Sequence, residues 1–247
     1  VLQWDDRMTI ATLTATKIGK RFGALSVLEG IDFAVTSAEA VGVVGPNGAG
    51  KSTLMAVLSG ALAPSGGRVT LNGRDITGLG AAERAGLGVM RTHQIPKPFL
   101  GLSVLENVLV GATHAGGARG EAAYALALDA LETTGMRGLS NRAAESLGLL
   151  DRKRLELARA MATGPRILLL DEIGGGLTDA EAEELVHMIN GLRAKGIGIV
   201  WIEHIVHILL QVAERLICMD AGRIIADGDP AEVMARPDVV RAYMGGV

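Results

Sequence analysis

The sequence contains a single cysteine, Cys218, so no disulfide can form within the chain. This cysteine usage is typical of proteins that work in a reducing cytosol. A surplus of positive charge is also lacking: 24 Lys and Arg stand against 27 Asp and Glu, and the formal net charge is −3 at pH 7. Because proteins that bind nucleic acid carry a basic patch or stripe, we expect no nucleic-acid partner.

Apolar runs long enough to span a membrane are absent as well. The best candidate, from Ile197 to Ala213, contains Glu203, His204 and His207, whose transfer into hydrocarbon would be costly. The N-terminus carries charged residues where a signal peptide would be apolar. We interpret residues 1–7 as an extension ahead of a candidate start at Met8. Any role at a membrane must then come through partners.

The most informative motif is a glycine-rich stretch between an apolar run, Ala40 to Val44, and a helical pattern, Thr53 to Leu58. A glycine-rich turn between a strand and a helix curls the backbone so that its N–H groups can bind phosphates, and the helix adds its positive end. Lys51 can then reach the β- and γ-phosphates, and the Ser52 hydroxyl can ligate Mg²⁺. A flexible surface turn is the alternative, which these flanks disfavour. The motif is Gly45-Pro46-Asn47-Gly48-Ala49-Gly50-Lys51-Ser52-Thr53.

Hydrophobic periodicity predicts strands that alternate with helices, which favours a doubly wound α/β core. The expected strands are residues 9–16, 28–36, 40–45, 68–73, 87–90, 166–172, 196–203, 215–219 and 223–226. The expected helices are residues 81–85, 103–110, 122–133, from about 152, and 179–194, with two short helices at the end. A capping box, Ser103 with Glu106, predicts the start of one helix. Lys17 to Gly23 is interpreted as a basic turn, and Gly111 to Gly120 as a mobile Gly/Ala-rich linker.

This pattern predicts a single domain of 247 residues. Its catalytic core covers about 8–92 and 165–247, and a helical subdomain of about 93–164 is inserted between the two parts. The first quarter combines short antiparallel strands with one buried parallel strand.

Two acids, Asp171 and Glu172, close the buried strand that begins at Arg166. In a phosphate-loop enzyme, an acid at the end of a neighbouring strand holds Mg²⁺, and Asp171 fits that role. Glu172, the next residue, points in a different direction from Asp171 and can accept a proton from the attacking water. It is therefore the general-base candidate. The alternative is that the two acids only mark a strand end at the surface.

Another polar residue, His204, ends the strand from Gly198 to Ile202. A histidine placed there can reach the γ-phosphate and hold the attacking water in line. Its alternatives are a satisfied core or helix-start histidine, or a metal ligand together with His207. No cysteine or acid cluster completes such a metal site, and the γ-phosphate contact is favoured.

The order of these motifs resembles that of the ABC-transporter ATPases, and the resemblance covers the chain from about residue 9. It implies a P-loop NTPase (RecA-like) core with an antiparallel β subdomain and an inserted helical subdomain, with ATP and Mg²⁺ bound. By this resemblance Gln94 is the Q-loop glutamine, which touches Mg²⁺ or the attacking water. Phe22 lies where an aromatic ring stacks on adenine, with core packing as the alternative, and Asp179 resembles the D-loop acid that crosses to a partner subunit.

The segment from Leu147 to Asp151 departs from the family pattern. It stands where the family has the signature L-S-G-G-Q, which opens a helix whose N-terminus grips the nucleotide of the other subunit. Gly148 replaces the serine, and two leucines replace the glycines. We therefore expect this segment to bind the nucleotide of the other subunit more weakly or with a different geometry. Ile173 in place of the usual proline is a milder departure.

Three stretches, residues 91–108, 153–160 and 236–245, are similar to the ATPases of branched-chain (hydrophobic) amino-acid importers. This resemblance implies a head-to-tail dimer of ATPase subunits closed by ATP, at the cytoplasmic face of the inner or plasma membrane. Transmembrane permease subunits would dock near Gln94–Phe99, and a periplasmic or extracellular binding protein would supply substrate. The alternatives are an exporter or lipid-extraction ATPase, a regulatory module with weak hydrolysis, or a soluble ABC protein acting on DNA or ribosomes.

Overall fold

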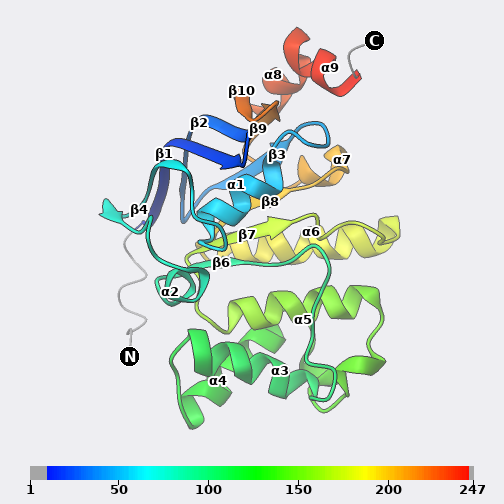
Figure 1. The fold of residues 1–247 in the computed structure, drawn as a ribbon. Helices are drawn as coiled ribbons and strands as arrows, with labels where there is room; N and C mark the ends of the chain where they lie inside the picture. Colours follow the sequence, from blue (N-terminus) through cyan, green and yellow to red (C-terminus); the bar gives the residue numbers. More distant parts are fainter. Residues whose placement is uncertain (1–9, 245–247) are drawn as a thin grey trace.

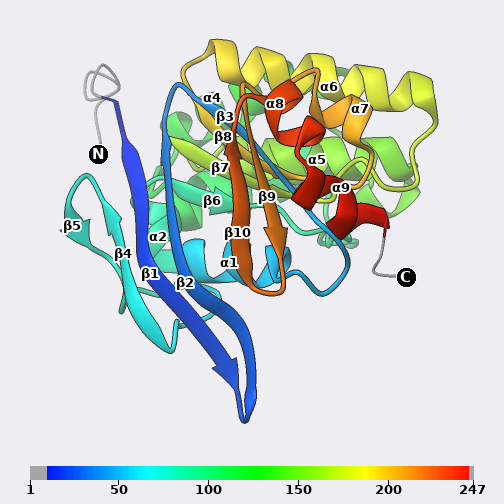
Figure 2. The same ribbon diagram turned by 90° about the horizontal axis from the view of Figure 1, so that it is seen from above.

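A computed structural model describes residues 10–244. The proposed extension and start at residues 1–8, and the first residue of the strand expected from Thr9, lie outside this range. Two sheets, a layer of helices and a separate helical block follow one another across the molecule (Figure 1). Figure 2 shows the antiparallel sheet standing beside the central sheet, with the long helices on the other side of the central sheet.

The central sheet has six strands in the order β10-β9-β3-β8-β7-β6. All neighbours in it are parallel except β10, which pairs antiparallel with β9. Every residue of β3, β7 and β8 is buried, because both faces of the sheet are covered, so these strands are apolar apart from two glycines and the terminal Asp171. The predicted buried strands are therefore confirmed. The bounds are β3 Ala40–Val44, β6 Val89–Arg91, β7 Ile167–Asp171, β8 Gly198–Ile202, β9 Arg215–Asp220 and β10 Arg223–Gly228.

The smaller sheet is antiparallel, in the order β2-β1-β4-β5. Its inner face, one face of the central sheet and helix α1 enclose a common apolar core. The short helix α2 leads from this sheet back to β6. The bounds are β1 Thr12–Phe22, β2 Leu25–Thr36, β4 Gly66–Leu71, β5 Arg74–Asp75, α1 Lys51–Leu58 and α2 Ala81–Gly86.

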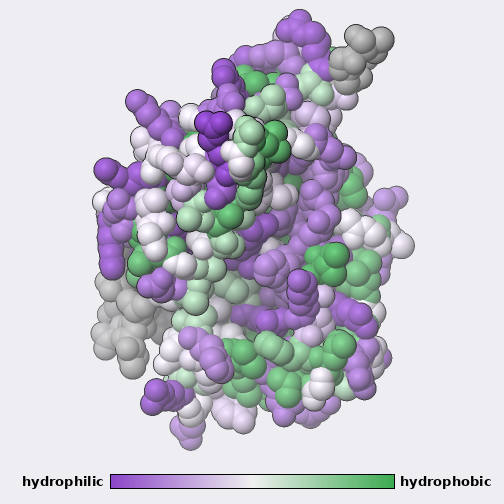
Figure 3. All heavy atoms as spheres, viewed as in Figure 1, coloured by the Kyte–Doolittle hydropathy of each residue, from purple (hydrophilic) through white to green (hydrophobic). Residues whose placement is uncertain are grey.

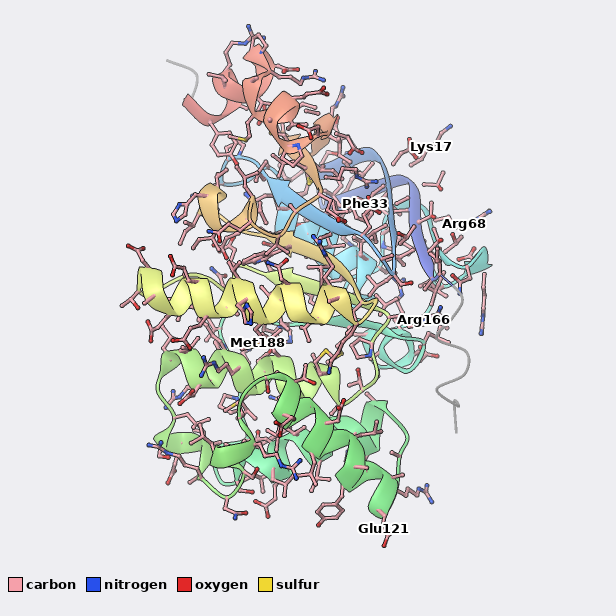
Figure 4. All side chains as sticks on the ribbon, turned by 180° about the vertical axis from the view of Figure 1, so that it is seen from behind. Lys17, Phe33, Arg68, Glu121, Arg166 and Met188 are labelled. Atoms are coloured by element: carbon pink, nitrogen blue, oxygen red, sulfur yellow. The ribbon has the colours of Figure 1, made fainter. Side chains whose placement is uncertain are left out.

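The predicted basic turn from Lys17 to Gly23 is wrong, because β1 continues through it to Phe22. Lys17 adopts a left-handed backbone conformation, with φ of 49°, and its N–H donates to Asp32 Oδ1 at 2.8 Å. The pairing with β2 shifts register on either side of Ile18, so the strand is bulged, not ended. Figure 4 shows the Lys17 side chain on the outside of the molecule, pointing away from it.

Helices cover the other face of the central sheet and form a second apolar core around Trp201. The longest, α6, spans Asp179–Ala194 as predicted. Thr178 caps it by accepting from the N–H of Glu181. The helices after it are α7 Val206–Leu209, α8 Pro230–Ala235 and α9 Pro237–Met244. Within residues 10–244, no helix has both the length and the apolar character needed to cross a membrane.

The inserted helices form a block with a core of its own, drawn in green in Figure 1. The capping box predicted at Ser103 is confirmed. The linker expected from Gly111 to Gly120 is wrong in its first half, which forms a π-helix. A side chain at Gly111 would come within 2.4 Å of the Arg159 carbonyl oxygen, so close packing orders this stretch. The bounds are α3 Val104–Val110, the π-helix η2 Gly111–Ala115, α4 Glu121–Thr133, the 3₁₀ turns η3 Arg137–Leu139 and η4 Ala144–Ser146, and α5 Leu149–Met161.

Candidate functional site

The glycine-rich loop joins β3 to α1 at the carboxyl end of the central sheet. Gly48 and Gly50 have φ angles of 82° and 98°, a left-handed conformation that glycine adopts without strain. A side chain at Gly50 would come within 2.9 Å of the Val27 carbonyl oxygen, so this position also needs glycine for space. Gly50 caps α1, and the loop and helix start together present backbone N–H groups suited to an anion.

Lys51, the first residue of α1, is buried. Its Nζ donates to the carbonyl oxygens of Gly45 at 2.7 Å and Pro46 at 3.0 Å. Burial lowers the pKa of Lys51, and the carboxylates of Glu172 and Asp171 oppose that shift. The loop therefore surrounds a fixed ammonium group, which gives it a positive charge for binding phosphate.

Asp171 ends β7 and is buried beside this loop. Its Oδ1 lies 3.5 Å from the Ser52 hydroxyl, and its Oδ2 accepts a hydrogen bond of 2.5 Å from Arg91. A hydroxyl and a carboxylate oxygen are the donors that Mg²⁺ prefers, so Ser52 and Asp171 fit a divalent cation. The Arg91 contact was not predicted. The only signal for this contact in the sequence is that Arg91 is a basic residue at the end of β6, the strand that pairs parallel with β7.

Glu172 receives side chains from two other segments. Gln94, in the segment after β6, donates from Nε2 to Glu172 Oε2 at 2.5 Å, and Nε2 of His204, after β8, lies 2.8 Å from Glu172 Oε1. Glu172 itself has φ of 50°, and its N–H donates to the Ile202 carbonyl oxygen at 2.9 Å. A non-glycine residue in the left-handed region is uncommon, and such residues gather at functional sites. The three predicted catalytic side chains are thus brought together.

A cleft of about 330 Å³ adjoins this group. Gln94, Glu172 and His204 line it together with Leu149, from the first turn of α5. Apolar surface lies beside it, along the segment between β6 and α3 and over the helices below, as the green areas of Figure 3 show. In that segment Ile95, Phe99 and Leu100 are exposed.

Most of the remaining predicted site residues lie on the surface, but Ala49, in the loop, is buried and only 2% exposed. Phe22 is 50% exposed, with Lys20 Nζ 5.1 Å from its ring centre, so the core-packing alternative for Phe22 is wrong. Asn47 is exposed in the loop, and Thr53 is half-buried in α1. Gly148 caps the start of α5 and Asp179 begins α6, both exposed.

Sequence reasoning missed Tyr243, which lies in the last helix, α9. Its hydroxyl accepts a hydrogen bond of 2.9 Å from the N–H of Gly45, the first residue of the loop. Gly45 is buried, and a side chain there would come within 2.1 Å of the Met219 carbonyl oxygen. The two partners are 198 residues apart, so no local pattern could have revealed the contact.

Tyr243→Phe should destabilise the fold by about 1–3 kcal/mol, because it leaves the buried Gly45 N–H without its partner. The change would be measured as the free energy of unfolding in urea. Tyr124→Phe is the matched control, since Tyr124 is 53% exposed on α4. Equal stability of the two variants would contradict a stabilising role for the Tyr243 hydroxyl.

Comparison with known proteins gives consistent matches. Residues 28–174 match the family model described as ABC transporter, and residues 223–247 match the model described as Branched-chain amino acid ATP-binding cassette transporter. The chain is 33% identical to the high-affinity branched-chain amino acid transport ATP-binding protein BraF of Pseudomonas aeruginosa, over 96% of this chain and 99% of BraF. It is 36% identical to the corresponding protein LivG of Salmonella typhimurium, with the same coverage.

Solved structures agree on the fold. A nucleotide-free ATP-binding cassette from an ABC transporter superposes with a TM-score of 0.87 at 32% identity, covering 96% of this chain and all of that one. A cassette of an ABC transporter in its ADP conformation gives a TM-score of 0.86 at 32% identity, with the same coverage. The α/β architecture, with its antiparallel β subdomain, is therefore that of an ATP-binding cassette.

Proposed function

Because the chain belongs to the ABC-transporter ATP-binding proteins, of the branched-chain amino-acid transporter type, we propose that it binds and hydrolyses ATP to drive amino-acid uptake. The observation that carries this proposal is the convergence of a phosphate-binding loop and an acid with two polar partners at one edge of the central sheet. The loop holds Lys51, and Glu172 lies between Gln94 and His204. Phosphoryl transfer needs a bound phosphate and an oriented nucleophile. The loop would bind the phosphate, and Glu172 with its two partners would orient the attacking water.

In the proposed reaction, water attacks the γ-phosphorus and Glu172 accepts a proton from this water, while the bond from the γ-phosphorus to the oxygen that bridges to the β-phosphate breaks and ADP leaves. Both oxygens of Glu172 have partners in this structure, and each oxygen keeps a second lone pair that can accept from the attacking water. His204 and Gln94 hold Glu172 from two sides, which orients the carboxylate and the water it binds. The backbone N–H groups of the loop and the Lys51 ammonium stabilise negative charge on the phosphates.

Ser52 and Asp171 would hold Mg²⁺, and Gln94 remains a proposed further ligand. When bound, the ion would supply charge that neutralises the phosphates and orients them. Arg91 occupies one oxygen of Asp171, which leaves the other oxygen facing Ser52. Arg91 thus fixes which carboxylate oxygen is available for the cation.

Phe22 is proposed to stack on the adenine ring, since it is exposed at the end of β1. Phe22→Ala should weaken ATP binding by about 1–3 kcal/mol, as expected for loss of one base–aromatic stack. Titration with ATP would measure this dissociation constant. Leu25→Ala is the control, because Leu25 is also exposed and begins the next strand. An unchanged affinity in Phe22→Ala would remove Phe22 from the adenine site.

A second ATPase subunit is proposed to complete each site. Gly148 and Asp179 support this proposal, because both stand exposed at helix N-termini, where backbone N–H groups or a side chain can reach a neighbouring subunit. The first turn of α5 carries Leu149 and Leu150 in place of glycines, together with the acid Asp151. A carboxylate beside a helix N-terminus partly offsets its attraction for phosphate, which is consistent with a weaker grip.

Replacing both Leu149 and Leu150 by glycine should strengthen the ATP-dependent dimer about tenfold, which corresponds to about 1.4 kcal/mol. The backbone could then approach the nucleotide more closely. Sedimentation with ATP, in a Glu172→Gln background that retains nucleotide, would measure the dimer dissociation constant. Leu25→Gly tests for a general effect of removing an exposed leucine. A weaker dimer in the double-glycine variant would show that the leucines themselves contribute to the interface.

Permease subunits of a transporter complex are proposed to dock on the segment that follows Gln94. Its exposed side chains Ile95, Phe99 and Leu100 support this, because apolar surface of this kind marks protein contacts. The protein would then work at the cytoplasmic face of the membrane through these partners. Branched-chain amino acids are the proposed substrate, delivered to the permeases by a binding protein.

Three measurements test this function. Magnesium-dependent release of phosphate from ATP by the purified protein is expected, whereas nucleotide binding without turnover would favour a regulatory module. Co-purification with two permeases, and loss of branched-chain amino-acid uptake in cells that lack this chain, test the transport role. Unchanged amino-acid uptake together with lost export of another compound would overturn the assigned substrate and direction.

A further inference from the structure

Lys153, in the second turn of α5, is only 4% exposed. Its Nζ donates hydrogen bonds to the carbonyl oxygens of Ile173 at 2.5 Å and Gly175 at 2.6 Å. Burial lowers the pKa of Lys153, and the negative charge of Glu203 opposes this shift. An ammonium from the helical block therefore holds the backbone that directly follows Glu172.

Glu203 holds the same segment by a different contact. It is 2% exposed, and its Oε2 accepts a hydrogen bond of 2.8 Å from the N–H of Gly174. Its Oε1 accepts from the N–H of His204 at 3.0 Å. A side chain at Gly174 would come within 2.7 Å of Glu203 Oε2, so this close approach requires glycine at position 174.

These contacts close a ring of residues that includes Glu172, the proposed general base. The side chains of Glu172 and His204 meet at 2.8 Å. Gly174, two residues after Glu172, is hydrogen-bonded to Glu203, the residue before His204. Glu172 is in the left-handed conformation, which persists only where the surroundings fix it. Lys153 is the direct polar link from this ring to α5, whose first turn follows Gly148.

We propose that Lys153 is a positioning residue, which sets the orientation of Glu172 and transmits the placement of α5 to it, with Glu203 as its buried counter-charge. The inference rests on the proposed ATPase function and deepens it. When nucleotide or a partner subunit shifts α5, the segment of residues 173–175 moves with Lys153, and Glu172 is carried toward or away from its working position. Lys153 contacts neither the phosphate loop nor Asp171 through these two bonds, so ATP binding itself does not require it.

Lys153→Met keeps the length of the side chain and removes its three donors. We expect kcat for ATP hydrolysis to fall about ten- to a hundredfold, as for a catalytic group displaced by about 1 Å, while the dissociation constant for ATP is unchanged. Lys153→Arg retains a cation with several N–H donors and should restore most of the lost kcat. The matched control is Arg152→Met, since Arg152 also donates to two carbonyl oxygens, those of Leu147 and Glu145, but both lie in its own helical block.

Several outcomes would overturn the proposal. A purely structural role predicts that Lys153→Met lowers the unfolding midpoint while the folded variant keeps the kcat of wild type. Parallel losses of ATP affinity and kcat would mean that the whole site has collapsed, and an equal loss in Arg152→Met would mean that any change in α5 suffices. If Lys153→Met does not fold, Glu203→Gln decides the matter: it removes the counter-charge and leaves one oxygen for the two N–H groups of Gly174 and His204, and it should lower kcat without weakening ATP binding.

Wild type and Glu172→Gln are measured alongside these variants, because they separate two kinds of failure. If wild type does not release phosphate, or if Glu172→Gln turns over normally, the proposed function fails. If both behave as expected and Lys153→Met and Glu203→Gln still match wild type, only the positioning role of Lys153 fails.

Discussion

Glu172→Gln should bind ATP with the affinity of wild type and hydrolyse it about 10²–10⁴ times more slowly, the range for loss of a general base. The amide has almost the same shape as the carboxylate and can still accept one hydrogen bond, but it cannot take up a proton from water. The amide oxygen can accept from Gln94, and the NH₂ group can donate to Nε2 of a His204 ring that carries its proton on Nδ1, which should hold the new side chain in place. Single-turnover phosphate release would measure the rate, and equilibrium titration the affinity.

Glu183→Gln is the control for this prediction, because Glu183 is an exposed acid on the surface of α6. It should leave both constants unchanged. An unaltered hydrolysis rate in Glu172→Gln would remove Glu172 from the role of general base. A comparable loss of ATP affinity would instead show that the carboxylate acts mainly in binding.

Lys51→Ala is expected to abolish tight ATP binding. Hydrogen bonds to charged groups contribute about 1.5–3 kcal/mol each, so loss of two such bonds to phosphate corresponds to about a hundredfold weaker binding or more. The variant also leaves the carbonyl oxygens of Gly45 and Pro46 without the donor that they have in this structure. Calorimetric titration with ATP would measure the affinity, with the free energy of unfolding measured on the same sample.

Lys195→Ala removes a lysine of the same kind at the end of α6, where its Nζ donates to Thr133. ATP affinity should be unaffected in this control. Undiminished ATP affinity in Lys51→Ala would contradict the assignment of the glycine-rich loop as the phosphate site. Comparing unfolding free energies distinguishes a lost phosphate contact from a loop that no longer folds.

Much of the fold could be predicted because its signals are local. Strands β3, β7 and β8 are apolar at every buried position except Gly42, Asp171 and Gly198, and the capping residues Ser103 and Thr178 mark the starts of α3 and α6. The two errors, at Lys17 and at Gly111, have one cause. In each case a contact distant in sequence, with Asp32 or with the Arg159 carbonyl oxygen, orders a stretch whose composition is typical of loops.

Glu172 and His204 were predicted as separate residues at strand ends, and Gln94 only through the family resemblance. Parallel strands bring their carboxyl ends to one edge of the sheet, but the contacts among these three side chains were not derivable from the sequence. The same holds for the unpredicted partners. Arg91 lies 80 residues from Asp171 in the sequence, and Tyr243 lies 198 residues from Gly45. No sequence motif or fixed spacing predicts that the residues of either pair meet.

Residue types and their local order are enough to identify the available chemistry: a glycine-rich loop with lysine and serine, two acids at the end of one strand and a histidine at the end of the next. They also indicate the class of fold, because hydrophobic periodicity depends only on neighbours along the chain. The orientation of these groups follows only from the folded chain, in which Glu172 is left-handed between two polar partners and Lys153 and Glu203 hold the segment behind it. Orientation depends on packing between segments far apart in sequence, and those distances exist only once the chain has folded.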